Sequence, residues 1–149
     1  MATFTAINCK RQSSGAMRGT LDYVMQQKKT RWDDAWLVTG HNCVPRSAYA
    51  EMLTTKQRFR KTDGRQFYHF VQSFSEDDPI TPAEANAIGL ELAQREFSGF
   101  EVVVATHVDT NHLHNHLVVN SVSCINGKKL HQSADDLLAH RQANNEICA

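Results

Sequence analysis

Four histidines fall within ten residues of this chain, at positions 107, 112, 114 and 116. Imidazole nitrogens are common ligands of divalent transition metals, and a site built from three of them leaves positions open for water or substrate. A single histidine on a strand is more often an ordinary core or surface residue. Several histidines in one register are much harder to produce by chance, so this segment predicts a metal centre.

Two flanking segments must position these side chains. Residues 101–106 and 117–119 are apolar and rich in β-branched residues, which strands favour. Between them, Asp109-Thr110-Asn111 is typical of a turn. The pattern predicts a β-hairpin with the histidines near its turn.

The register of this hairpin determines which histidines can meet. A loop of even length centred on Thr110-Asn111 places His107 directly opposite His114, and His116 then shares their face on the diagonal. The Cβ atoms of directly opposed residues are about 5 Å apart, and those of diagonal pairs about 7–8 Å. His107, His114 and His116 can therefore converge on one cation. The other face of the hairpin, which carries Leu113, Leu117 and Val119, is expected to meet helices.

Two further residues of the segment are candidates for supporting roles. His112 lies one pair nearer the loop and is the weakest ligand candidate. Asp109 pairs near it and could orient an imidazole by a hydrogen bond, so we count Asp109 among the catalytic candidates. His107-x-Asp109 with another histidine is also similar to the two-histidine, one-carboxylate iron oxygenases. In those enzymes, however, the third ligand normally comes from a distant strand.

The pattern His107-x-Asp109-x-x-His112-x-His114-x-His116, followed by Leu-Val-Val-Asn, resembles the metal-binding motif of the relaxases. These are the mobilization nucleases of conjugative plasmids and integrative elements, and their fold is named after a histidine–hydrophobe–histidine core. Asn115 occupies the hydrophobe position here, and Leu113 stands where many relatives carry proline. The resemblance extends through nearly all 149 residues.

The resemblance implies a function for the chain. Relaxases nick one DNA strand at a transfer origin with a tyrosine, forming a 5′-phosphotyrosine and a free 3′-hydroxyl, and the step reverses without ATP. The implied partners are single-stranded DNA at the origin and accessory mobilization proteins. The implied cofactor is one divalent ion, manganese or magnesium for activity. Ligand softness favours manganese, zinc or nickel at three imidazoles, so zinc or nickel could occupy the site in a crystal.

The chain has three tyrosines that could serve as the nucleophile. Tyr23 falls on a predicted helix over residues 15–28, on the flank of its apolar stripe, and matches the early catalytic tyrosine of the family. Tyr49 lies within the apolar stripe of a second predicted helix, and Tyr68 lies in a predicted strand beside phenylalanines. We therefore expect Tyr23 to be the nucleophile. His69, Gln72 and Ser73 are possible DNA contacts.

Composition limits the class of protein. A chain of 149 residues with 41% hydrophobic and 21% charged residues is an ordinary size and composition for one globular domain. Sixteen basic and sixteen acidic residues cancel, which counts against nucleic-acid binding, although basic residues cluster near positions 10–31 and 56–65.

Four cysteines lack metal-type spacing and are expected as reduced thiols. Because no apolar run could span a membrane and no signal peptide is evident, we expect a cytoplasmic protein.

The order of the predicted elements favours an α+β fold. It contains an antiparallel sheet of about five strands with helices packed on it. Capping motifs predict helix starts at Thr81-x-x-Glu84 and Ser133-x-x-Asp136. Predicted strands cover residues 3–8, 35–38, 66–74, 101–106, 117–125 and 128–131, and predicted helices cover residues 15–28, 45–60, 81–98 and 133–147.

We expect residues 1–149 to form a single relaxase catalytic domain. Relaxases usually continue well beyond the last helix, so the chain is consistent with a domain truncated at its C-terminus. The alternative to a relaxase is a metal-containing DNA-binding domain without catalytic activity.

Overall fold

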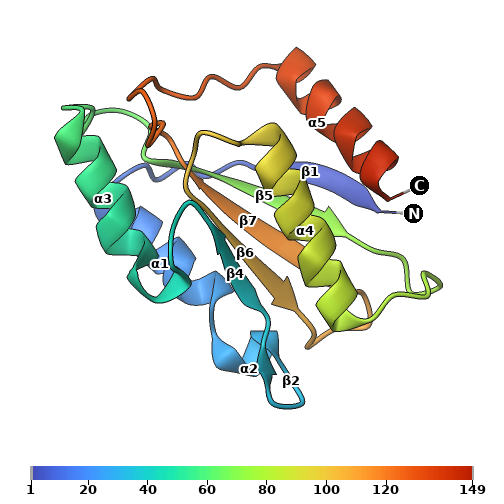
Figure 1. Cartoon of the computed structure of the whole chain (residues 1–149). Coiled ribbons are helices and arrows are strands. Elements are labelled where there is room, and N and C mark those ends of the chain that lie inside the picture. Colours follow the sequence, from blue (N-terminus) through green and yellow to red (C-terminus); the bar gives the residue numbers. More distant parts are fainter. Residues whose placement is uncertain (1, 149) are drawn as a thin grey trace.

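The computed structural model describes residues 2–148 and contains a five-stranded antiparallel sheet (Figure 1). The expected α+β class is thus confirmed. The central hairpin supplies two of the three inner strands. In spatial order the strands are β1 (Thr3–Ile7), β5 (Phe67–Ser73), β7 (His114–Asn120), β6 (Val102–His107) and β4 (Val38–His41).

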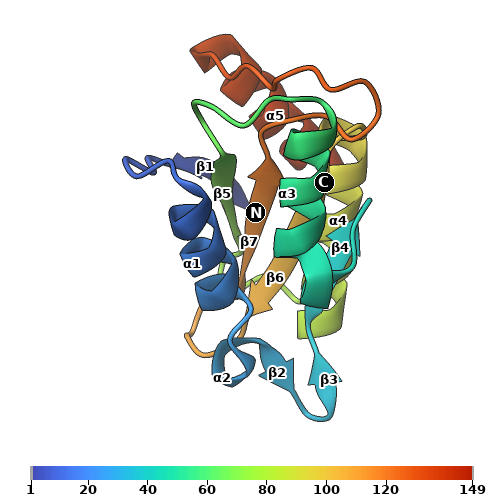
Figure 2. The ribbon, with the colours of Figure 1, turned by 90° about the vertical axis from the view of Figure 1, so that its left-hand side faces the viewer.

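Helices cover both faces of the sheet. Figure 1 shows α4 in front of the strands, and Figure 2 brings α1 and α3 toward the viewer. One core cluster joins α1 and α3 to the sheet face of Val103 and Val118, and another joins α4 and α5 to the face of Leu117 and Val119. Because both faces are covered, β6 is buried along its whole length. The helices are α1 (Ser14–Val24), α2 (Gln27–Thr30), α3 (Ala48–Arg58), which follows a 3-10 turn (Pro45–Ser47), α4 (Pro82–Glu96) and α5 (Ala134–Ile147).

The first predicted helix ends earlier than expected. The sequence predicts a helix to residue 28, but α1 stops at Val24, Gln26 leaves the helical region with φ −54° and ψ 128°, and α2 begins at Gln27. Carbonyls in the last turn of a helix have no partner within the helix. Here the carbonyl of Val24 lies 2.9 Å from His107 Nε2, and that of Met25 accepts a hydrogen bond from Trp36. These tertiary contacts stabilise the break.

Two strand predictions are wrong in detail. Residues 35–38 do not form one strand, because β3 (Ala35–Trp36) pairs with β2 (Arg31–Trp32) in a ribbon beyond the main sheet. The main-sheet strand is Val38–His41 instead. Residues 121–131 form only an isolated bridge between Val122 and Lys129, and Gly127 lies in the left-handed region with φ 75°. Beyond Asn120 the chain leaves the sheet, and the backbone N–H of Cys124 donates a hydrogen bond to the Gly99 carbonyl.

The predicted helix starts are confirmed. Thr81 with Glu84, and Ser133 with Asp136, form reciprocal capping boxes at α4 and α5. On α5, Leu138 is 59% exposed, whereas Leu137 packs against the core.

A line of buried polar side chains crosses the α4–α5 face of the sheet. Its centre is Asn115, whose amide nitrogen donates to Gln72 Oε1 (2.8 Å) and to the Ala85 carbonyl (2.7 Å). Thr106 donates to Asn115 Oδ1 and accepts from Asn86, and at the other end Gln72 donates to Asn144. Asn115, at the hydrophobe position of the motif, therefore has hydrogen-bond partners for both its amide oxygen and its amide nitrogen. The sequence-based suggestion that Gln72 contacts DNA is wrong, because its side chain is buried in this network.

Candidate active site

The strand register brings three histidines together at the end of the central hairpin. His107 pairs with His114 and Ala105 pairs with His116, so the predicted register is confirmed. One potential ligand nitrogen from each of the three rings lies within 4.8 Å of the others. Ring centroids are 5.0 Å apart for His107–His114, 4.2 Å for His107–His116 and 5.1 Å for His114–His116. This donor set matches a metal site with three nitrogen ligands.

In each ring, one nitrogen is already engaged with a neighbouring acceptor. His107 Nε2 is 2.9 Å from the Val24 carbonyl, and His114 Nδ1 is 3.0 Å from the His112 carbonyl. A carbonyl only accepts, so these nitrogens carry the protons and the opposite nitrogens have free lone pairs. Such partners fix the tautomer and orientation of metal-binding imidazoles.

The partner of His116 is another histidine. His116 Nδ1 lies 2.7 Å from Nε2 of His69, which projects from β5 on the same face of the sheet. When His116 donates this bond, its Nε2 has a free lone pair like those of the other two rings. From the sequence, His69 was expected only as a possible DNA contact. The signal for its position was the alternation of Phe67, His69 and Val71, but that alternation does not say which strand lies beside β7.

Burial favours the neutral form of His116, His69 and His107. It lowers the pKa of His116 to about 2 and that of His69 to about 4, and the neighbouring rings add to both shifts. Burial also lowers the pKa of His107. Neutral imidazoles are the form that binds metal, so the electrostatics of the site suit a cation.

His112 and Asp109 lie outside the cluster. The His112 side chain is largely exposed, with Nε2 3.7 Å from Glu76, in agreement with its rank as the weakest ligand candidate. The Asp109 carboxylate bonds to Lys29 Nζ at 3.1 Å, rather than to an imidazole as the sequence suggested. This ion pair also argues against a two-histidine, one-carboxylate iron site. Lys29 Nζ lies 5.3 Å from the centre of the Tyr23 ring, so Asp109 is linked to the tyrosine through Lys29.

Tyr23 lies next to the histidine cluster. Its ring is edge-on to His107 and His116, with centroids 6.1 and 6.4 Å away, and its side chain is 48% exposed. A tyrosine in the last turn of α1 thus has one side against the cluster and the other open to solvent.

The other two tyrosines are directed elsewhere. Tyr49 packs against the α1–α3 core beneath the guanidinium of Arg18. Tyr68 belongs to the opposite face of the sheet, where its hydroxyl donates to the Leu130 carbonyl at 2.8 Å and burial raises its pKa. All three tyrosines lie within the described residues, and Tyr23 alone contacts the cluster.

No helix within residues 2–148 combines the length and the apolar character that crossing a membrane requires.

The chain is similar to one family of known proteins and to several of its members. Residues 23–149 match a family model described as relaxase, MobA/VirD2-like, nuclease domain. Two Staphylococcus aureus proteins, each named Protein rlx, are 40% identical over 107 residues and 36% identical over 110 residues. These alignments cover 72% and 74% of this chain but 32% and 35% of the relatives. The group II intron-interrupted relaxase LtrB of Lactococcus lactis subsp. cremoris is 45% identical over 64 residues, 42% of this chain and 11% of that protein. The chain thus spans about a third of the length of the rlx proteins.

Proposed function

Because the chain belongs to the MobA/VirD2-like relaxase family, we propose that residues 1–149 form a catalytic domain that nicks one DNA strand at a transfer origin, with Tyr23 as nucleophile. The observation that carries this proposal is the edge-on contact of Tyr23 with His107 and His116. A nucleophile and a metal-binding set on one face are the two parts that a phosphodiester transfer needs. The expected partners are single-stranded origin DNA and accessory mobilization proteins, in the cytoplasm.

The three histidines are the proposed metal-binding residues. A divalent ion held by His107, His114 and His116 would withdraw charge from the non-bridging oxygens of the scissile phosphate. The imidazole set favours manganese, zinc or nickel by softness, and the family resemblance implies manganese or magnesium for activity. His69 and the carbonyls of Val24 and His112 would hold the three rings in orientation.

Tyr23 supplies the covalent step. Its hydroxyl oxygen forms a bond to phosphorus while the bond from phosphorus to the 3′-oxygen breaks, and the 3′-oxygen takes up a proton. The products are a 5′-phosphotyrosine and a free 3′-hydroxyl, and the reverse attack rejoins the strand. A phenol has a reference pKa of about 10, so its ionisation needs support. The Lys29 ammonium, held beside the ring by Asp109, stabilises the developing phenolate.

The reaction can be followed with end-labelled single strands that cover the transfer origin. With manganese, a 3′-end label should migrate with the protein on a denaturing gel, because the downstream fragment stays attached to Tyr23. A 5′-end label should appear in a shorter free strand with a 3′-hydroxyl. Chelation of the metal should abolish both products. Cleavage without any protein-bound label would show a hydrolytic nuclease and contradict the proposal.

A further inference from the structure

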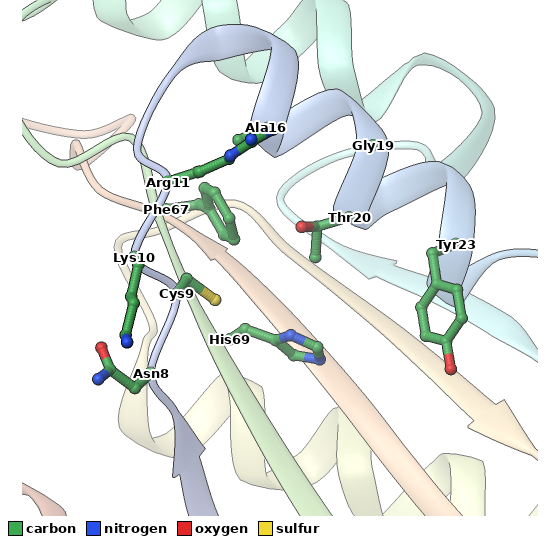
Figure 3. Close-up of a pocket in the computed structure, with 10 residues that line it drawn as sticks. All are labelled: Asn8, Cys9, Lys10, Arg11, Ala16, Gly19, Thr20, Tyr23, Phe67 and His69. Atoms are coloured by element: carbon green, nitrogen blue, oxygen red, sulfur yellow. The ribbon is translucent and has the colours of Figure 1, made fainter.

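A groove runs from Tyr23 along the exposed side of α1. It has a volume of about 550 Å³, within the range of about 300–1,000 Å³ usual for ligand sites. Figure 3 shows its residues, with Tyr23 at one end and Lys10 and Arg11 toward the other. Phe67 and His69 of the sheet line the groove between these ends.

The helical wall of the groove is made of small side chains. Ala16, Gly19 and Thr20 lie one and two turns before Tyr23, and all four share one face of α1. This face differs from the buried stripe that contains Met17 and Leu21. A Cβ atom added at Gly19 would meet nothing within 4 Å. The space beside the wall is therefore open and continuous with the tyrosine.

Positive charge lies at the end of the groove distant from Tyr23. Lys10 and Arg11 are both exposed, and neither has an ion-pair or hydrogen-bond partner among residues 2–148. Cations without protein partners are available to phosphate groups, and a backbone phosphate is the anion that a nucleic-acid strand brings past such a wall.

We propose that this groove holds one or two unpaired nucleotides adjacent to the phosphate that Tyr23 attacks. A base lies between the small-residue wall and the His69 ring, and the following phosphate binds Lys10 and Arg11. We expect a single strand to bind here in preference to a duplex, because the edge of an unpaired base is free to lie between α1 and His69 of the sheet. This assignment of the substrate strand depends on the proposed function.

Filling the groove tests the proposal. Gly19→Phe places a ring in the open space, whereas Gly15→Phe, on the exposed first turn of the same helix and outside the groove, is the matched control. Binding of a fluorescent single strand is measured by anisotropy in chelator, so that no cleavage occurs. Gly19→Phe should weaken binding roughly tenfold or more, since the loss of one base contact has an effect of about this size in single-strand binding. Gly15→Phe should leave it unchanged. Equal affinities for the two variants would overturn the proposal.

The charged end is tested by salt dependence. Each phosphate neutralised in a single strand contributes about 0.7 to the slope of log affinity against log salt concentration. Replacing Lys10 and Arg11 together by alanine should therefore reduce that slope by about 1.4. An unchanged slope would show that Lys10 and Arg11 do not bind a phosphate of the strand, which contradicts the proposed path.

Cys9 offers a measurement on the unaltered protein, which decides the matter if Gly19→Phe does not fold. Cys9 lines the groove, and Cys124 does not. A saturating single strand should slow alkylation of Cys9 and leave Cys124 unaffected, and a blunt duplex of the same sequence should protect neither. Unchanged alkylation of Cys9 with DNA bound would overturn the groove assignment. Because these experiments need no cleavage, their result is separate from the adduct test of the proposed function.

Discussion

Tyr23 is the tyrosine whose ring touches the histidine cluster, and its hydroxyl is the group on which the proposed chemistry depends. Tyr23→Phe removes only that hydroxyl. The protein–DNA adduct should fall by several orders of magnitude, as when a nucleophile is removed from other enzymes, while the urea midpoint and metal affinity stay unchanged. Tyr68→Phe is the control: it loses a hydrogen bond worth about 1 kcal/mol but should keep the adduct. Adduct formation by Tyr23→Phe with loss in Tyr68→Phe would reverse the assignment.

His114 and His112 are two residues apart, yet one lies in the cluster and the other outside it. His114→Ala should lower the affinity for manganese or zinc by more than the roughly 10- to 100-fold usual for loss of an outer hydrogen-bond partner. His112→Ala should change it little. Calorimetric titration of both variants measures the difference, and equal losses would mean that the proposed ligand set is wrong.

His69 is proposed to orient His116 without touching the metal. His69→Phe keeps an aromatic ring but removes the bond to His116 Nδ1, and should weaken metal binding by about 10- to 100-fold. His69→Gln retains a polar group at that position and should recover part of the loss. If the metal affinity of both variants equals that of the original protein, His69 has no orienting role.

At the scale of elements, the β6–β7 hairpin meets different requirements on its two faces. One face presents His107, His114 and His116, and the other carries Asn115 in the buried polar network. Helix α4 must approach closely for the Ala85 carbonyl to accept from Asn115. Gly89 permits this approach, because a Cβ atom there would lie 2.6 Å from Asn115 Nδ2 and 2.8 Å from Val104.

Two helical glycines should therefore respond oppositely to alanine. Gly19→Ala, in open space, should stabilise the protein by about 0.5–1 kcal/mol through helix propensity. Gly89→Ala should destabilise it by about 1–3 kcal/mol, because the added methyl group overpacks the helix–sheet contact. Urea unfolding of the two variants gives both values. Stabilisation by Gly89→Ala would show that the contact between α4 and the hairpin has room for a methyl group.

At the scale of the whole molecule, the net charge is zero but the charges are not all at the surface. Lys56 is 1% exposed at the end of the sheet away from the histidines, where its ammonium bonds to Asn120 Oδ1 and contacts Met17 Sδ at 3.5 Å. Asn120 in turn donates to the buried carboxylate of Glu101. Burial lowers the pKa of Lys56 to about 8, with Glu101 opposing the shift and Lys129 adding to it.

This buried amine should make stability depend on pH. Between pH 8 and about 10.4, the reference pKa of lysine, the folded protein has released the Lys56 proton while the unfolded chain still holds it. The contribution of Lys56 to the free energy of unfolding therefore rises with pH in this window, by at most about 1.4 kcal/mol per unit. Lys56→Met should lack this rise, while Glu101 and Lys129 remain in both proteins. Urea unfolding at pH 7.5, 8.5 and 9.5 measures the free energy of unfolding of the original protein and of Lys56→Met. If the difference between these two free energies does not change with pH, the prediction is contradicted.

The sequence by itself determined the local features of this protein. The hairpin register that aligns His107 with His114 follows from the turn residues and the two-residue period of a strand, since a slip by one would turn every side chain to the other face. The capping boxes at Thr81 and Ser133 are likewise set by neighbours three residues apart.

The tertiary structure decided what depends on segments distant in the sequence. His69 becomes the partner of His116 because β5 lies beside β7, and Asp109 binds Lys29 because the end of α2 packs near the end of β6. The early end of α1, the division of residues 35–38 and the burial of Gln72 all depend on contacts across the sheet. A periodic pattern shows that residues share a face but not which neighbour that face will meet, because strand order is fixed by the packing of the whole chain.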